Sequence, residues 1–163
     1  MEVIAYIYAL ANPNPMQYSF KGSLGRLSHQ VSRDLGKYLE AKFQEAGYSI
    51  NSHQWTVLSY LKEHQRSCQK DIARFLGTDK VMVKRIVDEL EQSSFVLREE
   101  DPDDKRFNQV VVTSLGEALF DSLAPKAEDV LMEAYEGIPD ASINQCLETL
   151  QFISGNLEGK LKK

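Results

Sequence analysis

The order of the segments between Asn51 and Gly116 constrains the fold of this chain more than any other feature. Two short amphipathic segments come first, a third begins near Asp79, and two strand-like segments joined by a turn come last. Three short helices and a hairpin can bury their apolar faces in one small core. The order predicts a helix-turn-helix followed by a hairpin, or wing, which makes the chain mainly α.

The first two helices of this motif are placed by their apolar residues and their caps. Ser52 is expected to cap the first, whose core side chains are Trp55, Leu58 and Leu61. A polar connection follows over Lys62–Ser67. The second helix is expected over Cys68–Leu76, and Gly77 supplies the left-handed residue that commonly ends a helix.

The third helix has two chemically different faces. Thr78 is expected to cap it, and four apolar side chains form a stripe toward the core: Val83, Ile86, Val87 and Leu90. The opposite face combines cations with two apolar residues: Lys80, Val81, Met82, Lys84 and Arg85. Such a face suits the major groove of DNA, where apolar groups meet thymine methyls and cations meet phosphates or guanine. A solvated basic face with two isolated apolar residues is the alternative.

The hairpin strengthens the DNA-binding interpretation. Its strands are expected over Phe95–Leu97 and Gln109–Thr113, with a turn between them. Lys105 and Arg106 lie in the turn, and a basic hairpin tip can enter the minor groove. Asp104 is expected to orient Arg106.

Composition limits the possible functions. The net charge of −5 over 163 residues argues against indiscriminate coating of nucleic acid. The acidity is uneven, because residues 62–85 contain more basic than acidic side chains. Cys68 and Cys146 are far apart, which predicts neither a disulfide framework nor a metal site and favours a reducing cytoplasm. We expect no cofactor.

Amphipathic helices are expected on both sides of the motif. One covers residues 17–46, a second begins with a capping box at Ser114, and a third covers residues 140–161. Residues 17–48 and 114–163 are therefore predicted to form a helical dimerisation region around a DNA-binding domain at 49–113, after an arm at 1–16. A cleaved export signal in that arm is an alternative, although no basic residue precedes its apolar run.

Four segments of the chain resemble the MarR family of bacterial transcription regulators. They are Gln54–Leu58, Lys70–Gly77, Val83–Glu91, and Asp101–Arg106 with the strand exit Val112–Gly116. The resemblance covers about Ser23–Lys160 and implies a cytoplasmic homodimer on a pseudo-palindromic site in double-stranded DNA.

The resemblance also implies a small amphipathic or aromatic effector. Four residues are candidates for its pocket, although core packing explains each equally well: Tyr38, Phe43, Trp55 and Phe95. Gln69, at the start of the second helix, is a further candidate DNA contact. Val81 and Met82 depart from the family, because many relatives carry serine or threonine there.

Other functional classes remain as alternatives or are excluded. Cys68 lies between two basic residues at a helix start, so a redox-responsive regulator is possible, but a small residue that fits is favoured. A winged helix that binds protein instead of DNA is the second alternative. No phosphate-binding loop, nucleophile elbow or orienting triad is present in the sequence, so we expect no enzyme. No segment is apolar and long enough to predict a membrane span.

Overall fold

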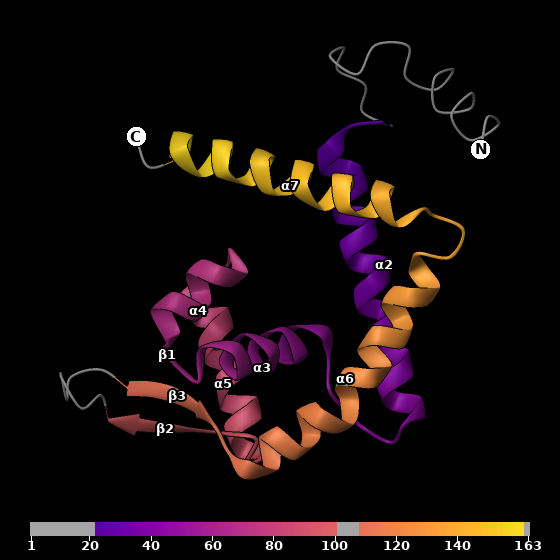
Figure 1. Cartoon of the computed structure of the whole chain (residues 1–163). Coiled ribbons are helices and arrows are strands. Elements are labelled where there is room, and N and C mark those ends of the chain that lie inside the picture. The colour runs from indigo at the N-terminus through magenta and orange to yellow at the C-terminus, as the bar shows by residue number, and fades with distance from the viewer. Residues whose placement is uncertain (1–21, 101–107, 162–163) are drawn as a thin grey trace. The chain divides into compact units, whose positions relative to one another are not determined.

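The computed structural model describes residues 22–100 and 108–161. Contacts divide the chain into two compact units, residues 1–127 and 128–163. Figure 1 labels the described helices and strands. The described elements are α2 (Leu24–Glu45), α3 (Ser52–His64), β1 (Arg66–Cys68), α4 (Gln69–Leu76), α5 (Lys80–Gln92), β2 (Val96–Glu100), β3 (Asn108–Val112), α6 (Ser114–Ala134) and α7 (Asp140–Leu161). The expected class, mainly α with a small sheet, is confirmed. Among the described helices, none combines the length and apolar character that crossing a membrane requires.

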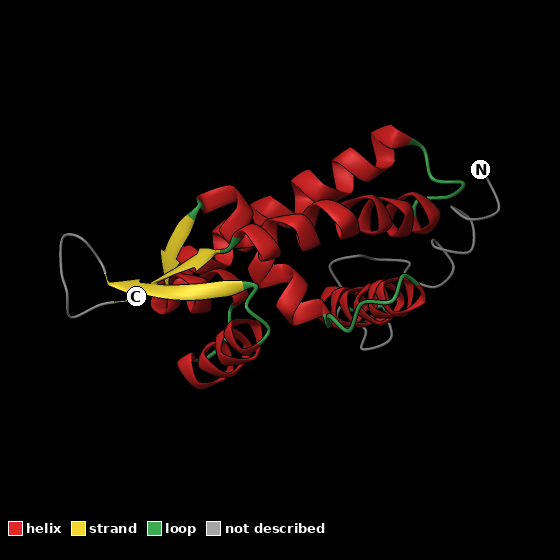
Figure 2. Ribbon diagram, turned by 90° about the horizontal axis from the view of Figure 1, so that it is seen from below, coloured by secondary structure: helices red, strands yellow, loops and turns green. Residues whose placement is uncertain are grey.

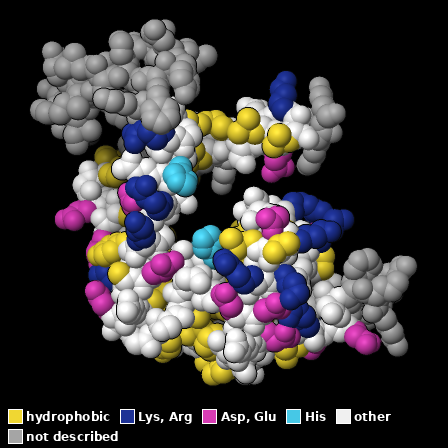
Figure 3. Space-filling view, turned by 180° about the vertical axis from the view of Figure 1, so that it is seen from behind, with side chains coloured by type: hydrophobic (Ala, Val, Ile, Leu, Met, Phe, Trp, Pro, Cys, Tyr) yellow, Lys and Arg dark blue, Asp and Glu magenta, His cyan; other side chains and the backbone are white. Residues whose placement is uncertain are grey.

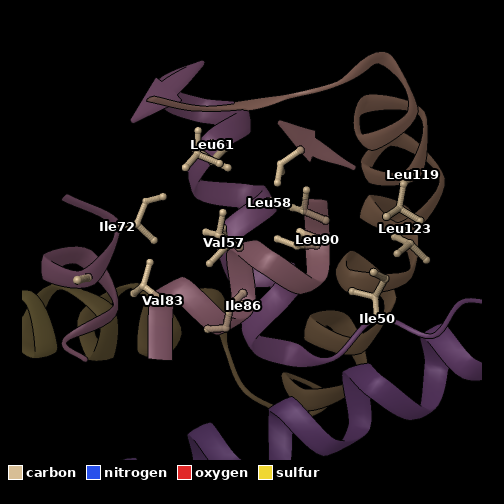
Figure 4. Close-up of a cluster of buried hydrophobic side chains, with 14 of the residues drawn as sticks. Ile50, Val57, Leu58, Leu61, Ile72, Val83, Ile86, Leu90, Leu119 and Leu123 are labelled. Carbon is tan, nitrogen blue, oxygen red and sulfur yellow. The ribbon is translucent and has the colours of Figure 1, made fainter. Parts of the chain in front are cut away.

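The core of the first unit forms around α5. Val83, Ile86, Val87 and Leu90 are at most 2% exposed, as the sequence predicted. They form one cluster with buried side chains of α3, α4, the sheet and α6. Figure 4 labels six of these, Val57, Leu58, Leu61, Ile72, Leu119 and Leu123, and Val96 and Val110 of the sheet belong to the same cluster. Because one face of α5 is buried in this way, its opposite face is fixed toward solvent.

The sheet contains one strand that the sequence analysis missed. Its order is β1-β3-β2, and both pairings are antiparallel (Figure 2). Residues 66–68 were predicted as part of a polar connection and a helix start, yet they form β1, where Ser67 pairs with Val110. Three residues carry too little alternation for a prediction, and their conformation is stabilised by pairing with β3.

Two predicted helix caps are displaced by one residue. α3 is capped by Asn51, not Ser52, and Asn51 exchanges hydrogen bonds with Gln54 in a capping box. α5 is capped by Asp79, not Thr78, through a 2.8 Å hydrogen bond from the amide three residues later. In both cases a side chain that can accept a hydrogen bond stands next to the predicted one, and sequence alone does not separate adjacent caps.

The start of α2 and the end of α4 each follow a common capping rule. The prediction that a helix runs from residue 17 is wrong for residues 22 and 23, because Ser23 caps α2 and accepts a hydrogen bond from the Arg26 amide. Gly77 ends α4 with φ of 62°, which confirms the predicted left-handed cap. Both ends fit the rule that polar or glycine residues satisfy the free backbone groups of a helix.

The exit from the sheet into α6 is held by Thr113, not by the predicted Ser114. Its hydroxyl donates to the Ser94 carbonyl at 2.7 Å and accepts the Gly116 amide at 3.0 Å, while its own amide donates to the Phe95 carbonyl. A Cβ at Gly116 would lie 2.0 Å from the Phe95 carbonyl oxygen. This position therefore requires glycine, and the contact fixes the start of α6 against the turn between α5 and β2.

The second unit is dominated by α7, which begins after a turn where Gly137 has φ of 77°. No residue of α7 is buried. Several of its large apolar side chains are well exposed: Leu147, Leu150, Phe152, Leu157 and Leu161. An amphipathic helix with its apolar side chains in solvent is typical of a surface that a partner covers.

Replacing Gly116 by alanine should destabilise the first unit. The added methyl group cannot avoid the Phe95 carbonyl without a backbone shift, so we expect a loss of about 2 kcal/mol and a Tm lower by roughly 4–8 °C. Gly25→Ala is the control, because a Cβ there meets nothing within 4 Å. Thermal unfolding of the three proteins compares them, and a Gly116→Ala protein with the wild-type Tm would contradict the packing described here.

Candidate nucleic-acid interface

The outward face of α5 is the candidate surface for nucleic acid, and we call Lys80, Val81, Lys84 and Arg85 the recognition face. All four side chains are exposed, Val81 by 78%. Helix periodicity predicts that these side chains share one side of α5, and the structure places them on that side. Figure 3 shows Lys and Arg side chains interspersed with Asp and Glu on one face of the molecule. Lys84 and Arg85 of α5 each have an acidic neighbour.

Met82 does not belong to that exposed face. Its side chain is half-buried and packs against the core cluster, whereas the sequence analysis expected it to be exposed. The reason is its place on the helix, one residue before Val83 and four before Ile86, at the edge of the buried stripe. The Met82 sulfur accepts a hydrogen bond from Arg85 Nη2 at 3.1 Å. Met82 thus contacts Arg85 from the edge of the recognition face.

Each of two cations on the recognition face pairs with an acid one turn later. Lys84 Nζ lies 2.6 Å from Asp88 Oδ2, and Arg85 Nε lies 3.9 Å from Glu89 Oε1. The hydrogen bond from Lys84, followed by that from Arg98, holds the pKa of Asp88 below its ordinary value. Exposed pairs of this kind contribute little to stability, so their cations can exchange a carboxylate for a phosphate at small cost.

Arg98 is the residue that sequence reasoning missed. It was assigned to the wing turn, but it lies within β2, on the same face as buried Val96, and only 18% of its side chain is exposed. Its guanidinium pairs with Asp88 at 2.6 Å and with Glu91, and its backbone amide donates to Glu91 at 3.1 Å. The period of two from Val96 was the available signal for this inward orientation.

Gln69 lies next to the same guanidinium. It is half-buried at the first position of α4, and with its amide oxygen toward Arg98 it accepts Nε at 3.0 Å. The structure therefore brings a residue proposed for DNA contact together with Arg98. The wing-tip residues Lys105 and Arg106, with the supporting Asp104, lie outside the described residues, as does the arm at 1–16.

Cys68 immediately precedes α4 but does not cap it through its side chain. Its thiol donates instead to Asp71 Oδ2 at 3.0 Å. Cys146, the second cysteine, lies on α7. Over residues 22–100 and 108–161, no three His, Cys, Asp or Glu residues come together as metal ligands would. The redox role of Cys68 stays a prediction.

The four residues proposed for an effector pocket differ in their burial and contacts. Phe43 is fully buried, and its ring meets Trp55 edge to face at 5.1 Å, while Trp55 stacks on Phe120 at 4.9 Å. Phe95 is half-buried against the same core, and Tyr38 is exposed beneath the Lys42 ammonium. Three of the four therefore pack with the core of the first unit, and a role in an effector pocket stays a prediction.

A surface hollow of about 320 Å³ lies elsewhere in the first unit, where α2 ends and α3 begins. Its lining contains none of the four candidates and consists of Glu40, Gln44, Tyr48, Ser49, Ile50, Asn51 and Gln54. Glu40 accepts the amide of Ser52 at 2.8 Å and its hydroxyl at 2.7 Å. The backbone hydrogen bond, followed by that of the side chain, lowers the pKa of Glu40.

This Glu40 contact predicts a specific loss of stability in acid. A carboxyl whose pKa is lowered by folding stabilises the fold above its unfolded pKa, and that contribution disappears as pH falls through the lower folded pKa. Wild type should therefore be more stable than Glu40→Gln at pH 7, and the difference should shrink below a pH of about 4. Denaturant unfolding of both proteins at pH 7 and at a pH below about 4 measures the difference in the free energy of unfolding. A difference that does not change with pH would contradict the prediction.

Comparison with known proteins matches the region that contains α5 and β2. Residues 50–107 match the model of the MarR family. The chain is 30% identical over 81 residues to the HTH-type transcriptional repressor NicR of Pseudomonas putida, a match covering 50% of this chain and 51% of that protein. The chain therefore spans about half the length of this curated relative.

Solved structures extend the likeness to most of the chain. CouR from Rhodococcus jostii, solved with p-coumaroyl-CoA, is 27% identical with a TM-score of 0.71, over 84% of this chain and 95% of CouR. A MarR-family regulator from Rhodococcus has 26% identity and a TM-score of 0.73, over 84% and 97%. BpsR of Bordetella bronchiseptica, whose DNA binding is regulated by 6-hydroxynicotinic acid, shares the fold at 20% identity and a TM-score of 0.74, over 85% and 97%. These likenesses confirm the predicted fold class.

Proposed function

We propose that the chain is a sequence-specific DNA-binding regulator of the MarR type that acts as a homodimer. The match of residues 50–107 to the MarR family and the likeness to a solved MarR-family regulator support this. The observation that carries the proposal is the recognition face. It is exposed on a helix whose other face is buried, next to a sheet whose strand β2 is ion-paired to that helix. A helix held in this way can enter the major groove as one body with its wing.

The chemistry of the recognition face supports contact with both backbone and bases. Lys84 and Arg85 supply exposed cations for phosphates or guanine, and Val81 supplies an exposed apolar side chain for a thymine methyl. Lys80 stands at the start of α5 as a further phosphate contact. Since the chain carries a net charge of −5, specific local contacts rather than overall attraction would provide the affinity.

Dimerisation is proposed through the helices outside the motif. The exposed apolar side chains of α7, together with Leu24 and Val31 of α2, form surfaces that a second copy would bury. Two modules related by a two-fold axis would contact half-sites about one helical turn apart, so the operator would be pseudo-palindromic. The domain division proposed from the sequence, with residues 49–113 binding DNA, follows the same reasoning.

Control by a small molecule is the finer part of the proposal. NicR is named as a repressor, and CouR was solved with p-coumaroyl-CoA. By analogy we propose repression relieved by a small amphipathic or aromatic effector. Such an effector changes DNA binding only if it prefers one arrangement of the two modules over the other.

DNA binding can be tested by fluorescence anisotropy with a duplex from the region upstream of the gene and with a scrambled duplex, each at two salt concentrations. We expect nanomolar, salt-sensitive binding to the first. Lys84→Ala, Arg85→Ala and Arg106→Ala should each weaken it and lower the salt slope by about 1. Arg33→Ala on α2 removes the same charge from an exposed pair with Asp34 and should leave binding unchanged.

Equal and weak binding to both duplexes would contradict the proposal and favour the interaction-module alternative. That alternative uses the same fold to bind protein and leaves the recognition face solvated. The two classes differ in one observable, because only a DNA-binding surface loses affinity and salt dependence together when a cation is removed.

If the chain is a dimer, we expect sedimentation equilibrium to give a molecular mass of twice the 18.5 kDa of one chain. Leu147→Glu with Leu150→Glu should shift the mass toward one chain, because two carboxylates would be buried in the interface. Gln145→Glu serves as the control, because it adds a carboxylate on roughly the opposite side of α7 from Leu147. A dimer that survives both leucine substitutions would rule out this face.

A further inference from the structure

Arg98 and Lys84 approach the same carboxylate from two directions. Arg98 Nη2 contacts Asp88 Oδ1 at 2.6 Å, and Lys84 Nζ contacts Asp88 Oδ2 at 2.6 Å. One negative charge is thus shared between a cation of the wing strand and a cation of the recognition face. Each cation is held there less strongly than it would be alone, because the two cations repel each other.

We propose that Arg98 is a positioning residue for DNA recognition, which keeps the Lys84 ammonium available to a DNA phosphate by occupying Asp88. The inference rests on the proposed binding of DNA through α5. It goes beyond it by assigning a role to a residue that lies behind the recognition face and does not touch the DNA itself.

The two cations differ in how easily they can leave Asp88. The Arg98 side chain is 18% exposed, so leaving would strand a poorly solvated guanidinium, whereas the Lys84 side chain is 68% exposed and can be rehydrated. Arg98 also presents a planar group with several donors to fixed acceptors. When a phosphate approaches, Lys84 is therefore the cation that moves, and Arg98 compensates the Asp88 charge that remains.

Glu91 holds Arg98 independently of Asp88. Its carboxylate pairs with Nη1 and also accepts the Arg98 backbone amide at 3.1 Å. The side chain and main chain of β2 are thereby attached to the last turns of α5. Neutralising Asp88 would leave Arg98 in place, which makes it possible to test the two carboxylates separately.

Removing the Arg98 guanidinium should leave Lys84 paired with Asp88 and less available to a phosphate. In an Arg98→Met chain, Lys84 would be the remaining cation of the described contacts to Asp88, and the pair would compete with phosphate more strongly. We expect DNA affinity to fall about tenfold and the salt slope to fall by about 1, as for the loss of one phosphate contact. Asp88→Asn should then restore most of both, because nothing retains Lys84.

A double-mutant cycle tests this with four full-length proteins: wild type, Arg98→Met, Asp88→Asn and the double variant. Anisotropy titrations with the upstream duplex at several salt concentrations, well below the lowest Tm of the four, give the affinities. The gain from Asp88→Asn should be at least about threefold larger in the Arg98→Met background than in wild type. Equal gains in both backgrounds would mean simple charge additivity and would overturn the proposal.

Controls separate this result from the failure of the proposed function and from loss of folding. Arg33→Met removes an arginine paired to an adjacent aspartate on α2 and should leave affinity and salt slope unchanged. If Arg98→Met does not fold, the cycle is repeated with Arg98→Gln, which removes the charge but keeps hydrogen-bond donors on the side chain. If wild type does not bind the duplex, the proposed function fails and this inference fails with it. If wild type binds and the cycle is additive, only this inference fails.

Discussion

The burial of one stripe of α5 is the interaction on which the rest of the structure depends. Val83, Ile86, Val87 and Leu90 lie in the core of the first unit, and α5 contacts α3, α4 and β2. A helix anchored along four positions cannot rotate without exposing them, at a cost of about 2 kcal/mol for each side chain. The direction of the recognition face is therefore a consequence of core packing.

Electrostatics then determine how this face can act. Asp88 and Glu89 pair with Lys84 and Arg85 in the free protein. The net charge of −5 adds no overall attraction to nucleic acid. The pairs on the surface are weak enough to exchange, whereas the half-buried Arg98 contacts are not. The same acid, Asp88, belongs to both groups and connects the wing strand to the recognition face.

Sequence patterns predicted what depends on local spacing and missed what depends on tertiary pairing. The stripe of α5 and the glycine cap at Gly77 follow from helix periodicity and backbone conformation, and both are confirmed. Caps were displaced by one residue, because Asn51 and Asp79 stand beside equally suitable neighbours. β1 could not be predicted, because its three residues are a strand only through pairing with β3. Arg98 was missed because the predicted strand ended at Leu97, one residue before it. Phe43 and Trp55 pack on each other, and their role in an effector pocket stays a prediction.

The central claim is that the exposed face of α5 contacts the major groove. Methylation protection of guanine N7, which lies in that groove, is the most direct test. With the wild-type protein on its upstream duplex, the account predicts two groups of protected guanines about one helical turn apart on one side of the DNA. Unchanged reactivity at every N7 under conditions where the protein is bound would contradict it and would place the contact outside the major groove.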